Sequence, residues 1–365
     1  TQEGDWKAHV LSAIARGKRR PNDLAYMCRY DRGMRPRTAV TLWQSLVRPI
    51  LEYASEIWSG QIPRHLMQKA EAVQLKFLRV ALGLHKNGSV VVDEVVRAEA
   101  GCERLQDRWA KLRLGYWRRV CVAPNGRLLR DVVEFRRREW IASGGRGWGS
   151  RGWMSTIKAT LDRHGLGVHW DNPASAVTMP KERWKDAVYA AVDASADSDR
   201  AVVLSNKPSA APYISLKEWG PNPVGYSFSV GESGKLGQHV PERYLDDRTN
   251  LKGTRLKMLC RVGCLPLMNR VGREASPPWP RELRTCDACR EGKIEDIHHF
   301  VMDCPKYADK RSGLLRRAVI ELAKSEGDLT AVEFATMQTG DQLTVLLEKR
   351  FSDPEAEDRI DRTMK

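Results

Sequence analysis

The chain has 365 residues, of which 61 are Lys or Arg and 46 are Asp or Glu, so its formal net charge is +15. Its hydrophobic content of 42% suffices for two or three ordinary domains. No run approaches the roughly 20 consecutive apolar residues of a transmembrane helix, and no segment at the start resembles a signal peptide. We therefore expect a soluble, intracellular protein of the nucleus or cytoplasm, with no membrane partner. Because the chain starts at Thr1 without Met and ends without a clear boundary, we also expect a piece of a longer protein.

The basic surplus is concentrated in the first part of the chain. Residues 1–150 contain 28 basic and 15 acidic residues, a net charge of +13, whereas residues 151–250 balance at 12 and 12. A basic field that is strong and local favours a polyanionic partner, and nucleic acid fits better than a membrane surface because no lipid-inserting face is evident. Eight cysteines are too few for a disulfide scaffold in a chain of this length.

Apolar residues of the first 125 positions recur with helical spacing. Between His65 and Leu82 the spacings are 4, 3, 4 and 3, and Gly83 follows as a stop signal. These apolar residues are Leu66, Ala70, Val73, Phe77 and Val80. A similar pattern predicts a helix from Glu103 to Cys121. A third stretch, Thr38 to Trp58, is predicted to be helical with a kink or break at Pro49.

The middle of the chain has a weaker pattern. Helices are predicted for Leu128–Ile141, Met154–His164 and Lys181–Ser195, and the chain beyond Ser205 is rich in Pro, Gly and Ser, which is typical of an irregular linker. Helical patterns return from Leu251 onwards and continue in residues 309–324 and 329–350.

The sharpest chemical signal is a group of three cysteines and a histidine. Cys286 and Cys289 are separated by two residues, nine residues lead to His299, and four more lead to Cys304. A C-x2-C turn lets two thiolates point inward, and H-x4-C places two further ligands about one helical turn apart, as a tetrahedral Zn²⁺ site requires. His298 is an alternative fourth ligand. We predict one structural Zn²⁺, bound by Cys286, Cys289, His299 and Cys304.

The sequence Tyr244-Leu-Asp246-Asp247 matches the Y-x-D-D pattern of a polymerase palm, where two carboxylates hold Mg²⁺ ions. The flanking residues do not form the two apolar strands that such a hairpin needs, and no earlier apolar strand carries a further Asp. We therefore interpret the segment as a solvated turn or helix start.

Basic residues also recur beside the apolar faces of the predicted helices. A stripe of this kind can neutralise a phosphate backbone without reading bases, although a solvated helix face has the same pattern. The candidate nucleic-acid contacts are Lys18, Arg19, Arg20, Lys69, Lys76, Arg79, Arg104, Arg108, Lys111 and Arg118. Among the twelve tryptophans, Trp148 and Trp153 in the Gly- and Arg-rich segment are candidates for base stacking, while most of the others are expected in the core.

Two blocks of sequence resemble the C-terminal part of reverse transcriptases from non-LTR (LINE-type) retrotransposons. The first contains residues 42–58 (LWQSLVRPILEYASEIW) and 73–83 (VQLKFLRVALG), which are similar to the segment that follows the palm. The second is the Cys/His group with Glu295-Asp296, Phe300, Pro305 and Tyr307, which resembles the zinc knuckle of the same elements. The blocks cover roughly residues 5–125 and 250–315.

This resemblance implies a mainly α fold. The expected parts are a helical thumb-like domain (1–125), an irregular linker region with helices (126–250) and a C-terminal zinc-knuckle domain with flanking helices (251–365). It also implies that the catalytic palm, with its Mg²⁺, lies upstream in the same polyprotein, so that this chain is not catalytic by itself although its parent is an RNA-directed DNA polymerase. The expected partners are RNA, an RNA–DNA hybrid or DNA. Two alternatives are a self-sufficient nucleotidyl transferase using Asp246 and Asp247, and a zinc-stabilised scaffold that binds protein.

Overall fold

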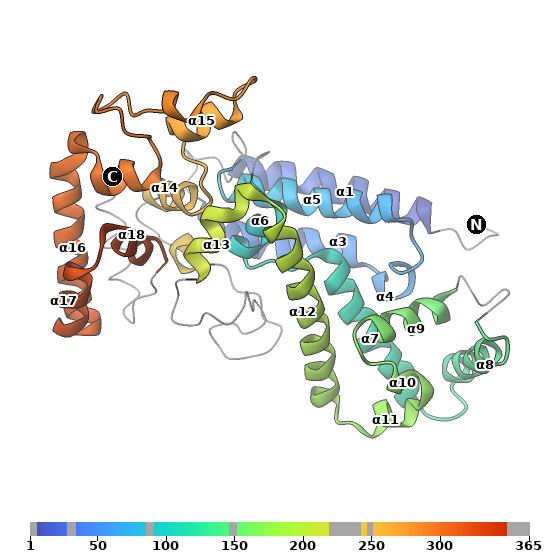
Figure 1. Cartoon of the computed structure of the whole chain (residues 1–365). Helices are drawn as coiled ribbons and strands as arrows, with labels where there is room; N and C mark the ends of the chain where they lie inside the picture. Colours follow the sequence, from blue (N-terminus) through green and yellow to red (C-terminus); the bar gives the residue numbers. More distant parts are fainter. Residues whose placement is uncertain are drawn as a thin grey trace.

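In the computed structural model the chain is mainly helical, as expected (Figure 1). The structure describes residues 6–27, 34–84, 91–145, 152–218, 242–246 and 251–348. Over these ranges there is no strand, and the one isolated β-bridge joins Thr285 to Ile294 in antiparallel orientation. None of the helices in these ranges combines the length and hydropathy needed to cross a bilayer.

The first hydrophobic core lies between the helices of the N-terminal third. Its elements are α1 (Lys7–Met27), α2 (Pro36–Leu42), η2 (Trp43–Val47), α3 (Arg48–Glu52), α4 (Ser55–Trp58), α5 (Arg64–Ala81), α6 (Asp93–Ala100) and the start of α7 (Leu105–Val122). The apolar face predicted for α5 is buried at Leu66, Ala70, Val73 and Phe77. Phe77 stacks on Trp43 with ring centroids 5.2 Å apart. The 3.6-residue spacing thus predicted both the helix and its buried side.

No break occurs at Pro49, because α2, η2 and α3 follow one another without a gap from Pro36 to Glu52. The five-residue π-helix η2 precedes Arg48, and Pro49 occupies the first turn of α3, where its missing N–H leaves no helical hydrogen bond unmade. Ala54 then takes a left-handed conformation (φ 55°) and separates α3 from α4. Trp58 of α4 reaches Trp109 of α7, with ring centroids 4.8 Å apart in an edge-to-face arrangement.

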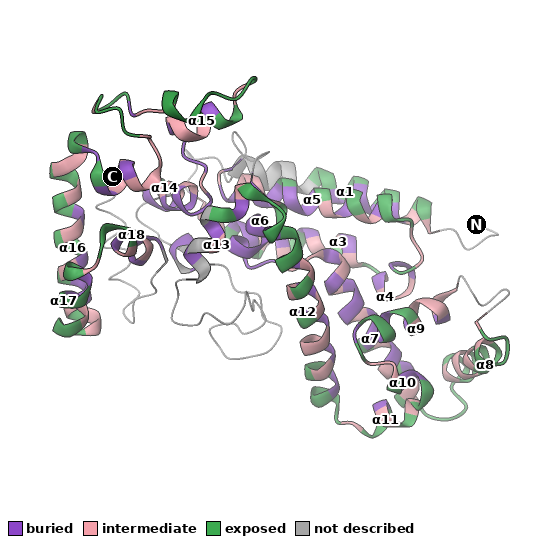
Figure 2. Ribbon diagram, viewed as in Figure 1, coloured by how far each residue is buried: buried purple, intermediate pink, exposed green. Residues whose placement is uncertain are grey.

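A second core, rich in tryptophan, follows between the far half of α7 and the next helices. Its elements are α8 (Leu128–Ala142), α9 (Trp153–Arg163), α10 (Val168–Asp171), α11 (Pro173–Thr178) and α12 (Lys181–Ser205). Trp117, Trp170 and Trp184 are buried there, whereas α8 has no buried residue (Figure 2). The helices predicted for Met154–His164 and Lys181–Ser195 are therefore present, as α9 and α12, and they pack around this core. Helix α12 extends ten residues past the predicted end at Ser195, because Ala196, Arg200 and Leu204 continue its buried face.

The C-terminal part does not begin as a separate unit at residue 251. The short helices η4 (Pro208–Ala210), α13 (Ala211–Glu218) and η5 (Arg243–Asp246) precede α14 (Leu251–Arg261). Met258 of α14 and Val262 after it are buried in the first core. The first core thus contains residues on both sides of the predicted boundary at residue 251.

The remaining elements lie beyond α14, and four of them, η7 and the last three helices, form a third core. The elements beyond α14 are α15 (Met268–Glu274), η6 (Arg281–Leu283), η7 (His299–Asp303), η8 (Pro305–Tyr307), α16 (Ala308–Glu326), α17 (Asp328–Thr336) and α18 (Thr339–Glu348). Leu314 and Leu322 of α16 pack with Phe334 of α17 and with Met302. Because Met302 belongs to η7, this core packs against the segment between His299 and Cys304.

Candidate metal centre and basic surfaces

Cys286 and Cys289 lie on a tight loop closed by backbone hydrogen bonds. The N–H of Cys286 donates to the carbonyl of Lys293 (2.8 Å), and the N–H of Arg290 donates to the carbonyl of Cys286 (3.1 Å). Arg290 and Gly292 both have positive φ (58° and 72°), which reverses the chain within a few residues. The loop therefore turns both thiols to the same side, as the C-x2-C spacing predicted.

His299 and Cys304 are brought together by the π-helix η7. The N–H of Cys304 donates to the carbonyl of His299 (2.7 Å), a bond between residues five positions apart, which is the repeat of a π-helix. An H-x4-C spacing matches this repeat better than the α-helical turn that we expected. One wide turn thus brings the His299 imidazole and the Cys304 thiol within 4.8 Å of each other.

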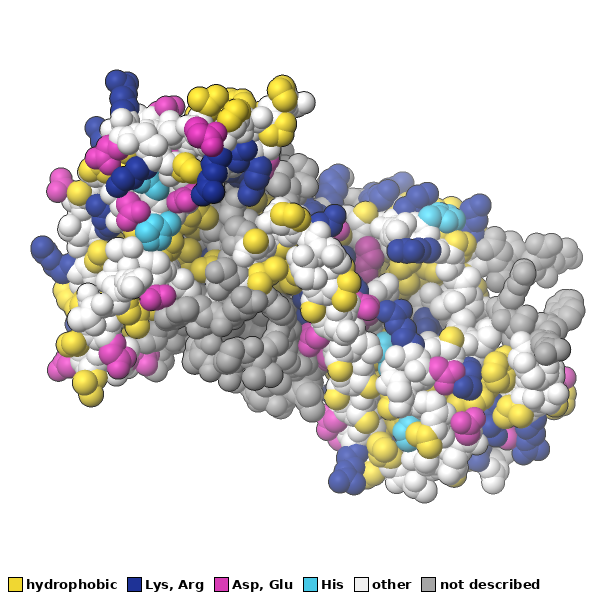
Figure 3. All heavy atoms as spheres, in the orientation of Figure 1, with side chains coloured by type: hydrophobic (Ala, Val, Ile, Leu, Met, Phe, Trp, Pro, Cys, Tyr) yellow, Lys and Arg dark blue, Asp and Glu magenta, His cyan; other side chains and the backbone are white. Residues whose placement is uncertain are grey.

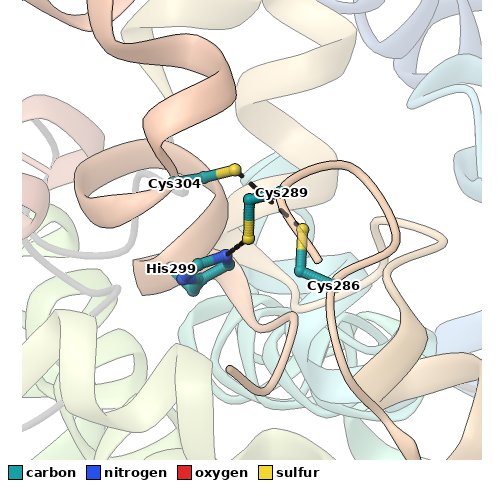
Figure 4. A group of neighbouring side chains, drawn as sticks. All are labelled: Cys286, Cys289, His299 and Cys304. Atoms are coloured by element: carbon teal, nitrogen blue, oxygen red, sulfur yellow. Dashed lines mark hydrogen bonds between the residues drawn. The ribbon is translucent and has the colours of Figure 1, made fainter. Parts of the chain in front are cut away.

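The four side chains converge on one point (Figure 4). All four ligand atoms lie within 4.8 Å of one another, with the Cys286 and Cys304 sulfurs 3.9 Å apart and Nε2 of His299 3.4 Å from the Cys289 sulfur. A tetrahedral ion with bonds of about 2.3 Å to sulfur and about 2.1 Å to nitrogen separates its ligands by roughly 3.8 Å and 3.5 Å. The group therefore has the size and the donor set to hold one metal ion, and Zn²⁺ is compatible with both.

His298, the alternative fourth ligand, points away from this group. Its Nδ1 lies 3.0 Å from an Asp303 carboxylate oxygen and its Nε2 3.0 Å from the Thr339 hydroxyl. His299 in contrast is only 4% exposed. Of the two histidines, the one predicted from the spacing, His299, is the member of the group.

The group offers four protein ligands, three of which are buried. Burial raises the pKa of the Cys286 thiol to about 11, although the nearby N–H groups of Cys289 and Ala288 act in the opposite direction. Without a cation this thiol therefore keeps its proton, and a divalent ion would displace it on binding. Four protein ligands fill a tetrahedral shell and leave no position for a substrate, which distinguishes structural from catalytic zinc.

Comparison of the chain with protein-family models, curated proteins and solved structures found no match.

The basic stripe predicted on α7 faces the interior. Lys111 has a fully buried side chain, and its Nζ lies 2.7 Å from Glu103 and 2.7 Å from Asp193 of α12. Burial lowers the pKa of Lys111, but Glu103 and Asp193 more than compensate, so the pKa stands above its ordinary value. We expected a stripe beside the apolar face and open to phosphate, and this expectation is wrong for Lys111 because α12 covers it.

The other three cations of that stripe also have partners within the chain. Arg104 pairs with Asp107 and with Asp199, at 2.6 Å and 3.0 Å. Arg108 pairs with Glu52 at 3.1 Å, and Arg118 donates to the carbonyls of Ala176 and Met179. The charges of α7 are thus largely used to bind neighbouring helices.

Helices α1 and α5 present a different basic surface. They pack against each other, and Figure 3 shows Lys and Arg side chains along the edge that they form. The exposed cations there are Arg16, Lys18, Arg19, Arg64, Lys69 and Lys76, and we name this set the α1–α5 face. None of the six has an ion-pair partner in the described ranges. Arg79 is only partly exposed and bonds to Asp93 (2.5 Å), and the side chain of Arg20 lies outside the described residues.

The Y-x-D-D sequence forms a short 3-10 helix, η5, and not a hairpin. Tyr244 and Leu245 are buried in the first core, at 2% and 1% exposure. The Tyr244 hydroxyl donates to the carboxylate of Glu99. Tyr244 and Leu245 therefore pack in the core and are not part of the solvated turn that we expected. Asp247 and the side chain of Asp246 lie outside the described residues.

Trp153 is partly buried, and its Nε1 donates to the carbonyl of Glu56 (2.8 Å), which makes it a packing residue; Trp148 lies outside the described residues. The sequence interpretation missed Trp279, the one exposed tryptophan in the part of the chain that the structure describes. Its neighbours Pro277, Pro278 and Pro280 were the available signal, since a tryptophan between prolines cannot belong to a helical apolar face.

Proposed function

We propose that this chain is the nucleic-acid-binding, C-terminal portion of a non-LTR retrotransposon reverse transcriptase. In this proposal the α1–α5 face grips the backbone of RNA, DNA or an RNA–DNA hybrid, as a polymerase thumb does. The Cys286, Cys289, His299 and Cys304 group holds one structural Zn²⁺. The palm and its Mg²⁺ belong to an upstream part of the same polyprotein.

The observation that carries the proposal is that the six cations of the α1–α5 face have no acidic partner among the described residues. Between Trp6 and Arg20 the sequence has no acidic residue, and the acidic residue of α5, Glu71, is held by Arg97 at 3.1 Å. Six exposed cations therefore project from two packed helices without internal partners in the described ranges. A phosphate backbone would supply those partners and release its counterions.

The metal has a structural role in this proposal. Between Ser276 and Lys293 most side chains are exposed, so the loop has little apolar surface with which to stabilise itself. A bound Zn²⁺ would link that loop to η7 and α16, because the free energy of metal binding is also free energy of folding.

The proposal is tested by measuring affinity for a labelled hybrid duplex at several salt concentrations. For wild type we expect affinity to fall steeply with salt, and for Lys69→Gln/Lys76→Gln we expect the logarithmic slope to decrease by about 2, close to one per lost contact. The matched control is Lys181→Gln/Arg183→Gln, which removes the same charge from two exposed residues at the distant start of α12. A wild-type affinity that does not depend on salt would overturn the proposal and favour a zinc-stabilised scaffold that binds protein.

A further inference from the structure

Trp279 is unusual among the tryptophans of this chain. It is 37% exposed, whereas the six of the two helical cores (Trp43, Trp58, Trp109, Trp117, Trp170 and Trp184) are at most 2% exposed. It lies between α15 and η6, in the segment Pro277-Pro278-Trp279-Pro280. Exposing a large aromatic ring is costly, so its position calls for a reason other than packing.

The ring is held in place and does not hang freely. The N–H of Trp279 donates to the carbonyl of Gly272 (2.7 Å), and Arg284 donates to the Trp279 carbonyl from Nε (3.0 Å) and Nη2 (2.6 Å). A Cβ at position 272 would lie 2.9 Å from Cε3 of the ring and 2.8 Å from Cγ of Arg284. Glycine at 272 therefore lets the ring rest against α15. Because the Trp279 side chain is already ordered, less conformational entropy is lost when a ligand binds to it.

Two exposed arginines lie close to Trp279 in the chain: Arg281 is two residues away, and Arg273 follows Gly272, against which the ring rests. Arg273 and Arg281 are exposed, and within the described ranges neither has an acidic partner. Two of the four acidic residues of the segment 268–293 are already engaged, Glu274 by Arg270 (2.8 Å) and Glu291 by Lys293 (3.8 Å). Figure 3 shows basic and hydrophobic side chains gathered together over α15.

This platform is connected to the metal centre through Glu295. The Glu295 carboxylate accepts a hydrogen bond from the N–H of Met268 (2.7 Å) and lies 3.5 Å from the sulfur of Cys286. Its N–H donates to the carbonyl of Arg284 (3.0 Å), the residue that holds Trp279. The metal loop and the ring are thus parts of one hydrogen-bonded unit.

We propose that Trp279, with Arg273 and Arg281, is a stacking platform for an unpaired nucleobase of single-stranded nucleic acid. An apolar protein partner would cover the ring but would also desolvate two unpaired guanidinium groups at high cost. A nucleotide can cover the ring and also pair with the guanidinium groups, since its base stacks on the indole and its phosphate pairs with arginine. Bases inside a duplex are already stacked, so the ring accepts an unpaired base. This inference rests on the proposed nucleic-acid-binding function. It adds that the C-terminal part of the chain, which carries the metal group, binds single-stranded nucleic acid.

The experiment uses the metal-loaded chain and single-stranded RNA and DNA oligonucleotides that contain 2-aminopurine, whose fluorescence falls when it stacks. We expect quenching on binding to wild type, and for Trp279→Ala the loss of quenching with roughly tenfold weaker single-strand affinity. Trp279→Phe should keep part of both effects. Duplex affinity should stay the same in both variants.

The matched control is Leu283→Ala, which removes an exposed apolar side chain (64% exposed) two residues beyond Arg281. It should leave quenching and affinity unchanged. Trp279→Ala with wild-type single-strand affinity, or an equal loss in Leu283→Ala, would overturn the stacking platform while duplex binding persists. A wild-type chain that binds neither duplex nor single strand would overturn the proposed function itself.

Discussion

The buried ion pair between Glu99 and Arg261 offers a stringent test of how this chain is held together. Glu99 is 0% and Arg261 1% exposed, and the Arg261 guanidinium contacts the Glu99 carboxylate at 2.8 Å from Nη2 and 3.1 Å from Nε. Tyr244 donates to the same carboxylate, and Nη1 of Arg261 donates to the carbonyl of Leu347 (2.5 Å). One pair therefore connects α6, η5, α14 and α18.

Removing either charge alone should be far more damaging than removing both. Glu99→Leu removes the closest acidic partner of the buried guanidinium, whose distance to Glu242 is 3.5 Å, and Arg261→Met leaves a buried carboxylate without this arginine. We expect each single variant to lose about 3–5 kcal/mol of unfolding free energy. The double variant removes both members of the pair, and its costs are the loss of the Tyr244–Glu99 hydrogen bond, about 1–3 kcal/mol, and of the contact between Glu242 and Arg261. The two single effects should thus exceed the double effect by at least 2 kcal/mol.

The measurement is urea unfolding followed by far-UV circular dichroism, combined with amide hydrogen exchange. Exchange should accelerate together in α6, α14 and α18 of the single variants, because these elements share the pair, and should stay slow in α9 of the second core. Additive single effects, or a loss below about 1 kcal/mol in Glu99→Leu, would refute the view that this pair couples the N-terminal and C-terminal parts.

Two further predictions concern the metal group and a buried histidine. The chain should hold one zinc ion that Cys289→Ser releases and His298→Ala retains, with faster amide exchange mainly in residues 280–310; a metal-free chain with unchanged exchange there would contradict this. Burial, with a smaller contribution from Arg163 and Arg113, lowers the pKa of His164 to about 4, below the value of 6.5 for an exposed histidine. Between these pH values the unfolded chain binds a proton that the folded chain does not, so stability should fall as pH falls through this window. His164→Gln should lessen this dependence in urea unfolding at pH 7 and pH 4.5, and an unchanged slope would count against it.

Features that depend on neighbours in sequence were predictable. The spacing of Leu66, Ala70 and Phe77 predicted the extent of α5 and its buried side, because helical periodicity is a local property. The spacing of the cysteines and His299 likewise predicted the group of four metal ligands. The x4 spacing to Cys304 also favoured His299 over His298, but the contact of His298 with Thr339, 41 residues away, could not be predicted locally.

Features that depend on distant partners were not predictable. Lys111 was expected at the surface, but its partner Asp193 lies 82 residues away on a helix whose packing no local pattern indicates. Tyr244 was expected in a solvated turn, but its partner Glu99 is 145 residues away. In both cases an amphipathic or polar sequence is compatible with exposure and with burial, and the tertiary partner decides.

The same reasoning changes how the net charge of +15 should be understood. Cations of α7 contribute to that number but are largely neutralised by α12 and Glu52, so they offer little to an external anion. Exposed cations without a printed ion pair in the described ranges include the six of the α1–α5 face, and Arg273 and Arg281 near Trp279. The first surface has rows of charge without an exposed tryptophan, which suits a duplex backbone, and its affinity should disappear at high salt. The second combines charge with an indole, so its affinity for unpaired bases should persist in part where the first has failed.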